Sequence, residues 1–420
     1  MRKLPIIIVG AGPAGMMAAI CAAQFYHPVI LLEKNSSCGC KLLLTGKGRC
    51  NLTNLCSLEE FLSRFFSNGQ FLRDAFKEFF NTDLMEFFRE RGVELVVERQ
   101  QRVFPASGKA KTILETLQRE LRGRNVQVIC NCSVKDIVTE ENHIRAVKLK
   151  DGRRLSACCV VIATGGVSYP DTGSTGDGIR WARQTGHSIV PLRPGLVGLW
   201  VGTDEVLPEG LTLKNIRLTF FNQNKKIITD IGEMLFTAQG ISGPLVLTYS
   251  GLIADWLLEK KEVWVSIDFK PALSFEQLHN RLLREFQNAP AKRWKNILKE
   301  LLPISMIDVF VKRLGFSPNT TANQITARQR QQIVQLLKDF RLRICSTALL
   351  KEAMITRGGV SVKDIDPRTM QSRLIQGLYF CGEVIDVDAD TGGFNLQAAF
   401  STGWLAGKSA ALLAKTKTLS

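Results

Sequence analysis

The glycine spacing near the start of the chain carries the clearest chemistry. Gly10, Gly12 and Gly15 form a G-x-G-x-x-G pattern between an apolar run at 5–9 and a small-residue stretch of helical character. In a dinucleotide-binding βαβ unit, the first glycine permits a tight turn and the second lets a pyrophosphate approach the backbone. The third lets helix and strand pack closely, and the phosphates face the N-terminus of the helix. The pattern therefore predicts a dinucleotide site.

An acidic residue at the expected place supports this interpretation. A second apolar run at 29–32 ends in Glu33, where a carboxylate can hold the ribose hydroxyls. The glycine pattern alone also fits a glycine-rich turn of another α/β fold. Strand, helix and acidic residue in this order favour the nucleotide interpretation.

Three further segments have the composition of cofactor loops. The loop at 40–54 combines glycines, cations and asparagines, and can wrap a pyrophosphate or be a plain surface loop. A buried strand at 155–163 ends in Thr164 and Gly165, which places them at the carboxyl edge of a parallel sheet. The turn-rich segment at 168–178 follows, and it is either a linker or the border of a substrate site.

The last segment favours a flavin over a nicotinamide. A strand at 377–380 leads into Gly382 and Glu383, and Gly392 and Gly393 precede a closing helix at 395–413. Free N–H groups at that helix start stabilise the negative charge that a flavin develops on its pyrimidine side when it is reduced. A nicotinamide has no such need, so the segment predicts FAD as the bound cofactor.

These blocks together resemble the BaiN/YhiN-like family of FAD-binding, NAD(P)/FAD-dependent oxidoreductases, also called the aminoacetone oxidase family, which includes ribosomal RNA dihydrouridine synthases. The matching blocks lie at 10–15, 41–54, 104–107, 163–178, 232–244, 358–360 and 382–398. The resemblance implies FAD contacts at Gly10, Gly12, Gly15, Glu33, Lys34, Lys41, Gly48, Arg49, Cys50, Asn51, Thr164, Gly165, Gly382, Glu383, Asp386, Gly393, Asn395 and Leu396. Lys47 departs from the family pattern, which usually has a further glycine there.

The order of elements predicts an α/β protein with a discontinuous Rossmann-like FAD-binding domain, an inserted β-barrel and a helical subdomain. Strand patterns with glycine turns occupy 1–190 and return over 345–420. Short runs of alternating apolar and polar residues at 191–270 indicate a β-barrel-like insert. The pattern at 271–344 predicts a basic helical insert. Within the first part, the Phe-rich stretch 58–91 has a helical pattern.

The positive charge is unevenly distributed. The chain has 55 Lys and Arg against 39 Asp and Glu, a net charge of +16. Between Lys270 and Arg343 there are fourteen Lys and Arg against five Asp and Glu. Such a stretch is either a solvated helical face or a surface for a polyanion. Its candidate contacts are Lys292, Arg293, Lys295, Lys299, Lys312, Arg313, Arg328 and Arg330.

The resemblance implies several reactions: reduction of bile acid intermediates, oxidation of small amines, and reduction of uridine to dihydrouridine in large-subunit ribosomal RNA. The basic stretch favours the last, because only that substrate is a polyanion. We expect NAD(P)H to be a transient electron donor, since the chain has one dinucleotide fingerprint. The alternatives are a flavin-dependent reductase or oxidase of a small unsaturated or amine substrate, and a non-catalytic flavoprotein that binds RNA or a partner.

Uridine reduction also needs a proton donor, for which the candidates are Cys50, Tyr169 and Glu383. His187 is a fourth possibility, although its place at a helix end favours a packing role. Cys50 is the candidate closest to the expected flavin loop. A small buried residue that supports this loop is the alternative for Cys50, and the one we favour.

Composition excludes several other classes. The eleven cysteines include no paired C-x-x-C motifs and are spaced unlike a disulfide ladder, so we expect reduced thiols and no bound metal. No apolar run approaches the length of a membrane span. These features predict a cytoplasmic protein without a membrane partner.

Overall fold

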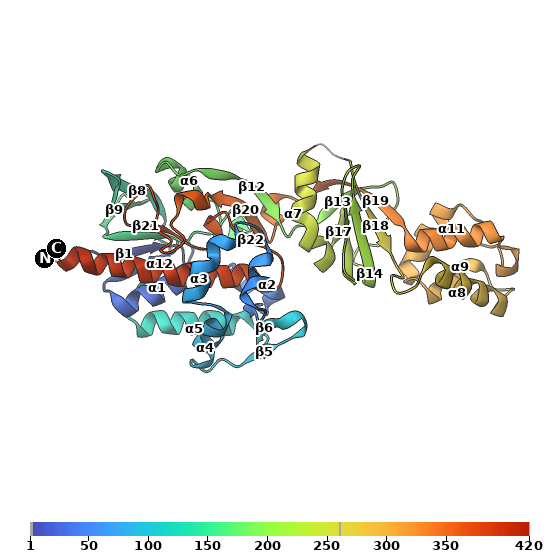
Figure 1. Ribbon diagram of the computed structural model, residues 1–420, viewed down its shortest axis with the longest axis horizontal. Helices are drawn as coiled ribbons and strands as arrows, with labels where there is room; N and C mark the ends of the chain where they lie inside the picture. Colours follow the sequence, from blue (N-terminus) through green and yellow to red (C-terminus); the bar gives the residue numbers. More distant parts are fainter. Residues whose placement is uncertain (1–2, 260–261, 420) are drawn as a thin grey trace. The chain divides into compact units, whose positions relative to one another are not determined.

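The computed structural model describes residues 3–259 and 262–419, which form two compact units (Figure 1). Unit 1 joins two segments that are distant in the sequence, Met1–Gly195 and Leu350–Ser420. Unit 2 is the intervening segment, Leu196–Leu349. The two end segments of the chain thus form one unit, and the middle segment forms the other.

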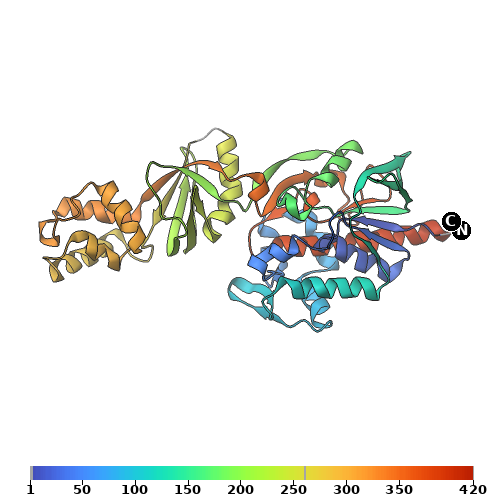
Figure 2. The same cartoon turned by 180° about the vertical axis from the view of Figure 1, so that it is seen from behind.

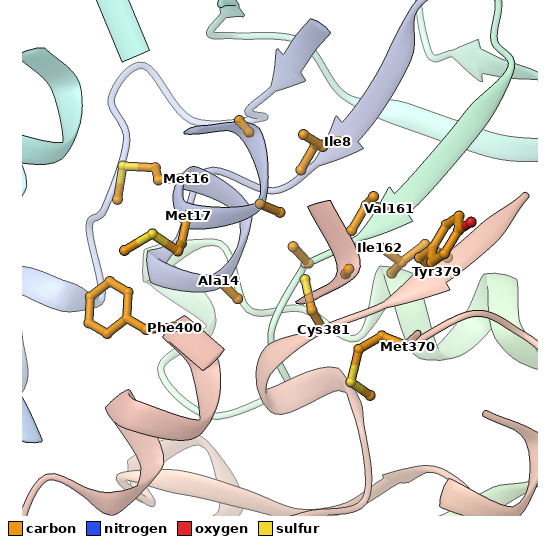
Figure 3. Packing of buried hydrophobic residues seen from close by; sticks show 14 of the residues in the cluster. Ile8, Ala14, Met16, Met17, Val161, Ile162, Met370, Tyr379, Cys381 and Phe400 are labelled. Carbon is orange, nitrogen blue, oxygen red and sulfur yellow. The ribbon is translucent and has the colours of Figure 1, made fainter. Parts of the chain in front are cut away.

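A parallel sheet forms the centre of unit 1. Its strand order is β21-β11-β1-β2-β7, and every neighbouring pair is parallel. The central strands are buried along their whole length, which explains their continuous apolar sequence. Figure 3 shows side chains from this sheet and from α1 in one apolar cluster, among them Ile8, Ala14, Val161 and Tyr379. The strands are β1 (Ile6–Val9), β2 (Val29–Leu32), β7 (Gln127–Ile129), β11 (Cys159–Ile162) and β21 (Leu378–Phe380).

Two helices from opposite ends of the chain pack together against this sheet. Helix α1 (Pro13–Phe25) follows β1, and α12 (Phe394–Leu419) closes the chain. They lie side by side in both views (Figures 1 and 2). A Cβ atom at Gly403 of α12 would lie 2.3 Å from the carbonyl oxygen of Ala14, so the backbones of the two helices touch there. Gly407 makes the same kind of contact with Ala18, so the interior of α12 runs parallel to α1 from the first turn of α1 onward.

Smaller elements surround this core. The expectation of a helical stretch over 58–91 is partly wrong, because β4 interrupts it and pairs with β22 near the other end of the chain. This pairing overrides the local Phe-rich pattern. The remaining strands of unit 1 are β3 (Thr53–Asn54), β4 (Phe65–Ser67), β5 (Leu95–Val97), β6 (Arg102–Pro105), β8 (Val134–Glu140), β9 (His143–Leu149), β10 (Arg154–Ser156), β12 (Ile189–Gly195), β20 (Ile355–Val360) and β22 (Asp388–Ala389). Its other helices are α2 (Leu58–Ser63), α3 (Arg73–Glu78), α4 (Asn81–Arg89), α5 (Ala110–Gly123) and α6 (Asp177–Gln184).

Unit 2 begins with an antiparallel sheet. Its strand order is β15-β14-β16-β17-β13-β19-β18, with a further pairing between β14 and β18. The β-barrel expected from the sequence stays a prediction. Helix α7 (Pro244–Leu258) was not expected, because its apolar residues surround the helix and give no clear helical period. The strands are β13 (Leu199–Gly202), β14 (Thr212–Phe221), β15 (Lys226–Ile228), β16 (Gly232–Thr237), β17 (Gly240–Ser242), β18 (Val263–Asp268) and β19 (Phe340–Thr347).

Four helices complete unit 2. They are α8 (Phe275–Asn288), α9 (Trp294–Ile297), α10 (Ile307–Leu314) and α11 (Ala327–Lys338). Ser274 and Thr326 cap α8 and α11 by accepting N–H bonds from the first helical turn. The helical insert expected over 271–344 is wrong at its end, because β19 begins at Phe340 and pairs with β18.

Within the described residues, no helix combines the length and apolar character that a membrane crossing requires. The same part of the chain contains no group of His, Cys, Asp and Glu side chains placed to hold a metal ion. All eleven cysteines are free thiols.

Candidate active site

A cavity of about 500 Å³ lies within unit 1, where the carboxyl ends of β1, β2 and β11 meet. The turns that follow these strands line it, together with the start of β20 and the first turns of α12. Ligands of open α/β sheets bind at this edge of the sheet, and the volume suits a small-molecule site. The cavity is therefore the candidate cofactor site.

The glycine turn leaves an open cradle in this cavity. Gly10 has a φ of 102°, which favours glycine, and a Cβ there would lie 2.6 Å from the carbonyl oxygen of Ala163. Gly12 is the N-cap of α1, and a Cβ there would meet no atom within 4 Å. The nearby Thr164 hydroxyl also lines the cavity, and its oxygen is buried without a hydrogen-bond partner among the residues that the structure describes. An open cradle and an unsatisfied hydroxyl fit the pyrophosphate of a dinucleotide.

Glu33 lies at the end of β2 and joins the turns of two strands. Its carboxylate accepts the N–H groups of Ala11 and Asn35, each at 2.9 Å. The next residue, Lys34, pairs with Asp177 at 2.9 Å across the cavity lining. A carboxylate has acceptor capacity beyond these two bonds, so Glu33 can also accept a ribose hydroxyl.

A second charged network lies between Lys41 and Glu383. The Lys41 Nζ atom donates to Glu383 Oε2 at 2.7 Å and to the Ser168 hydroxyl at 2.6 Å. The other Glu383 oxygen accepts the Thr356 N–H at 2.7 Å and the Ser168 hydroxyl at 3.1 Å. The structure thus joins four segments that are far apart in the sequence. Ser168 and Thr356 were not predicted as site residues from the sequence. Ser168 lies in the turn-rich segment at 168–178 that the sequence singled out, whereas Thr356 lies outside every such segment.

Eleven of the cofactor residues implied by the resemblance line the cavity. They are Gly10, Gly12, Glu33, Lys34, Lys41, Thr164, Gly165, Gly382, Glu383, Asn395 and Leu396. The others lie outside its lining: Gly15, Gly48, Arg49, Cys50, Asn51, Asp386 and Gly393. Lining residues without a sequence signal include Cys132, Ser133, Val134, Lys150 and Met354.

Several of the outlying residues bind other parts of the protein. The Asn51 amide, in the orientation that satisfies both its ends, donates to the Thr53 carbonyl and accepts the Gly393 N–H at 3.1 Å. Arg49 pairs with Glu98 and lies 4.3 Å over the Phe104 ring. These contacts hold the loop at 41–54 against the start of α12 and the β6 strand.

Asp386 and Asn395 also make contacts that shape this end of the chain. The Asp386 carboxylate accepts the Asn68 amide at 2.9 Å, and its pKa is raised by burial. Asn395 accepts the Ala389 N–H at 2.9 Å and donates to the carbonyl of the same residue at 2.8 Å. Asn395 thus closes the loop before α12 while it lines the cavity.

The proton-donor candidates differ in position. Cys50 is fully buried outside the cavity lining, and burial raises the pKa of its thiol to about 12. His187 is buried against Phe380 and contacts the Ser372 hydroxyl at 2.7 Å, and burial lowers its pKa. Tyr169 is half-buried beside the cavity-lining Pro170. Glu383 alone among the candidates lines the cavity.

Tyr169 also has an unusual backbone. Its φ of 51° and ψ of 60° lie in the left-handed region, which bulky residues rarely adopt. Its N–H donates to the Lys351 carbonyl at 3.2 Å, and its ring lies 6.0 Å from Lys41 Nζ. A strained residue next to a cavity is a candidate for a functional role.

The parallel sheet, the glycine turn and the open cradle define a Rossmann-type dinucleotide-binding protein. The chain belongs to the HI0933-like protein Rossmann domain family, whose model matches residues 4–409. It is similar to the 3-dehydro-bile acid delta(4,6)-reductase of Clostridium scindens, with 32% identity over 96% of this chain and 98% of that protein. It is also similar to the ribosomal RNA dihydrouridine synthase of Escherichia coli, with 31% identity over 96% of this chain and 97% of that protein. The chain is accordingly a flavin-dependent oxidoreductase.

Solved structures show the same fold. The 3-ketosteroid delta1-dehydrogenase of Sterolibacterium denitrificans matches with a TM-score of 0.56 and 13% identity, over 97% of this chain and 99% of that chain. The FrdA subunit of E. coli quinol fumarate reductase matches with a TM-score of 0.52 and 19% identity, over 99% of this chain and 72% of that chain.

Proposed function

We propose that the protein is an FAD-dependent reductase that uses NAD(P)H and reduces a uridine of large-subunit ribosomal RNA to dihydrouridine. The relatives from E. coli and Haemophilus influenzae that carry the name ribosomal RNA dihydrouridine synthase support this substrate. The observation that carries it is the charge of unit 2. Six exposed cations of its helical part have no ion pair within the described residues: Arg284, Lys292, Arg293, Lys299, Lys312 and Arg328. Cations of this kind provide most of the sequence-independent affinity for RNA.

In this proposal the cavity of unit 1 holds FAD. The cradle at Gly12 and the N-terminus of α1 take the pyrophosphate, and Glu33 takes the ribose hydroxyls. The start of α12, at Asn395 and Leu396, takes the pyrimidine end of the flavin. When bound, the flavin supplies hydride transfer. NAD(P)H reaches it transiently, because the sequence has one dinucleotide fingerprint.

Polar groups in and beside the cavity position the ligand and supply a proton. Lys41, Ser168 and the Thr356 N–H all donate to Glu383, so its carboxylate is held as an acceptor. We therefore assign Glu383 a positioning role, and Cys50 a packing role. In this proposal Tyr169 is the proton donor, because it lies beside the cavity lining with a strained backbone and with its ring 6.0 Å from Nζ of the cavity-lining Lys41.

Kinetics of the two half-reactions test this assignment. Tyr169→Phe should keep FAD and its reduction by NAD(P)H, and slow reoxidation by the RNA substrate about 10²- to 10⁴-fold. Cys50→Ala is the matched control, and it should reoxidise at nearly the parent rate if it retains FAD. Equal reoxidation by Tyr169→Phe and the parent would remove Tyr169 from the mechanism.

A small unsaturated substrate is the second candidate. The Clostridium scindens relative, named a bile acid reductase, is as similar to this chain as the RNA-modifying relatives are. In that case the exposed cations of unit 2 are a solvated face. Reduction of an unsaturated steroid ketone by the purified protein, without any effect on RNA, would favour this candidate.

Mass spectrometry of ribosomal RNA nucleosides from cells with and without the gene tests the proposed reaction. Loss of dihydrouridine from large-subunit RNA, restored by the parent gene, is the expected result. A gene with Lys292, Arg293, Lys299 and Arg328 changed to Glu should restore less of it, while the purified variant keeps its flavin spectrum. Unchanged dihydrouridine in the deletion strain would refute the substrate assignment.

A further inference from the structure

Unit 2 contains an open groove that lies mainly on its antiparallel sheet and borders the end of helix α11. It has a volume of about 570 Å³ and lies on the antiparallel sheet, around the turn that joins β14 to β15. The end of β14, the turn at 222–225 and the start of β15 line it. Single residues of β18 and β19, the last residue of α11 and Asp339 complete the lining. Its lining is mainly polar, and it contains four cations and one carboxylate.

The floor of this groove is electrically balanced. Lys338 pairs with Asp268 at 2.6 Å and donates to two backbone carbonyls. Arg341 pairs with Asp339 at 2.6 Å, and the pKa of that carboxyl is lowered by Arg341 and by the Ser266 hydroxyl, against the effect of burial. These two cations therefore serve the fold as well as the groove.

Two lysines on the rim carry the surplus charge. Lys225 and Lys226 are exposed, and neither has an ion pair within the described part of the chain. They lie outside the stretch between Lys270 and Arg343 that dominates the charge in the sequence. Two adjacent free ammonium groups on a rim suit consecutive phosphates of a nucleic acid strand.

The groove also offers a flat aromatic surface. Phe221 is half-buried at the end of β14, and the Arg341 guanidinium lies 5.5 Å from the centre of its ring. Asp339 binds this guanidinium through both oxygens, at 3.0 and 2.9 Å from Nε, which fixes its orientation. Aromatic rings and guanidinium planes are the groups on which proteins stack unpaired bases.

The turn beside Phe221 supplies a donor. Asn222 Oδ1 accepts the N–H groups of Asn224 at 2.9 Å and Lys225 at 2.8 Å, which fixes the turn. The Nδ2 atom of Asn222 is buried and has no hydrogen-bond partner in the described part of the chain. An amide N–H fixed in this way can donate to a carbonyl oxygen of a base.

We propose that this groove binds an unpaired nucleotide of an RNA strand, so that the base stacks on Phe221 and Lys225 and Lys226 contact its flanking phosphates. This proposal rests on the proposed function and gives the RNA a contact on the antiparallel sheet, in addition to the six exposed cations of the helical part. The substrate region is single-stranded at this contact, because a paired base has no free face for an aromatic ring. A groove for an acidic peptide would use the lysines but would not need the aromatic surface or the buried amide.

Binding measurements with the FAD-loaded protein test the groove. The probe is a labelled single-stranded oligouridylate, followed by fluorescence anisotropy over a range of salt concentrations. Reversing both rim lysines, K225E with K226E, should weaken binding at least about 10-fold and lower the log–log salt slope by about 2. The matched control reverses Lys148 and Lys363, two exposed lysines of unit 1 that have no ion pair among the described residues, with the same change in net charge. It should bind nearly as well as the parent.

Variants of Phe221 test the stacked base. Phe221→Leu should lower the affinity about 5- to 150-fold, the range for loss of one base–aromatic stack, and Phe221→Trp should restore it. An RNA hairpin stem should compete weakly. Equal binding by the parent and the rim-lysine variant would overturn the proposal, and so would equal losses in that variant and its control. Unchanged binding by Phe221→Leu would overturn the stacking.

The reaction and the groove can fail separately. Groove-dependent RNA binding with unchanged dihydrouridine in the deletion strain would refute the proposed reaction and keep the groove. Loss of dihydrouridine in that strain, together with RNA binding that the groove variants do not change, would keep the proposed reaction and refute the groove. The K225E, K226E variant could instead bind RNA as the parent does and bind an acidic peptide more weakly than the parent. That result would identify a protein, not RNA, as the partner of the groove.

Discussion

Two glycines of the same motif should respond in opposite ways to one added methyl group. At Gly15 a Cβ would lie 1.8 Å from the carbonyl oxygen of Gly10 and 3.1 Å from the Ala163 Cβ. The oxygen belongs to the backbone, so α1 must move away from β1 by more than an ångström. At Gly12 the same Cβ meets no atom of the protein within 4 Å, and the φ of −78° suits any residue.

The magnitudes follow from these contacts. Overpacking of this kind costs about 3 kcal/mol or more, so Gly15→Ala should lower the Tm by roughly 6 °C or more. Gly12→Ala should leave the Tm of the FAD-free protein nearly unchanged, because substitutions without contacts stay within about 0.5 kcal/mol. Its methyl group would displace the pyrophosphate from the N–H groups of α1. Loss of one hydrogen bond to a charged group costs about 1.5–3 kcal/mol, which is about a 10- to 150-fold weaker affinity for FAD.

Calorimetry of the FAD-free proteins and titration with FAD separate the two effects. Gly12→Ala should fold normally and bind FAD weakly, whereas Gly15→Ala should be unstable whether or not FAD is added in excess. Full affinity for FAD in Gly12→Ala would show that the pyrophosphate does not lie at this turn. A normal Tm for Gly15→Ala would contradict the packing argument.

Three further predictions concern titratable groups. Cys345 is exposed and should react with iodoacetamide in the native protein, whereas Cys50, buried with a thiol pKa of about 12, should react only after unfolding; peptide mass spectrometry distinguishes the two. Burial raises the pKa of Asp388 to about 6, so the folded parent loses stability as the pH rises from about 4 to about 6, where the unfolded chain ionises freely. Relative to Asp388→Asn, that loss should reach about 3 kcal/mol in urea unfolding, and a pH-independent difference would refute the shift. Lys41→Met should cost about 1–3 kcal/mol by leaving Glu383 without its cation, and Lys41→Met with Glu383→Gln should recover part of that loss in the same assay.

The sequence predicted the elements whose pattern is set locally. The βαβ start at 6–32 follows from apolar runs and glycine spacing, and both depend only on neighbouring residues. The stretch over 58–91 was predicted less well, because β4 exists only through its pairing with Asp388 and Ala389. Helix α7 was missed because a helix that is apolar on all sides loses the period that would identify it.

Within the cavity, the predictable residues are those on strand ends. Glu33, Thr164 and Gly382 follow strands of one parallel sheet, so their arrival at a common edge follows from the topology. Thr356 has no such signal, since it enters the site through its backbone N–H, which every residue type except proline provides. Its hydroxyl accepts the N–H groups of Val167 and Ser168, a long-range contact that only the fold creates.

Charged residues show most clearly where sequence reasoning stops. The number of Lys and Arg residues follows from the sequence, but the sequence does not show which of them form ion pairs with Asp or Glu in the fold. The family resemblance implied that Arg49 contacts the cofactor, and in the structure Arg49 pairs with Glu98 and lies over Phe104. The same applies to Arg313, a candidate RNA contact, which pairs with Glu205 at 2.7 Å and lies 3.7 Å over the Phe340 ring. Arg313→Glu should therefore impair folding of unit 2 rather than RNA binding alone, and tests of an RNA surface belong on cations without such partners, such as Lys292.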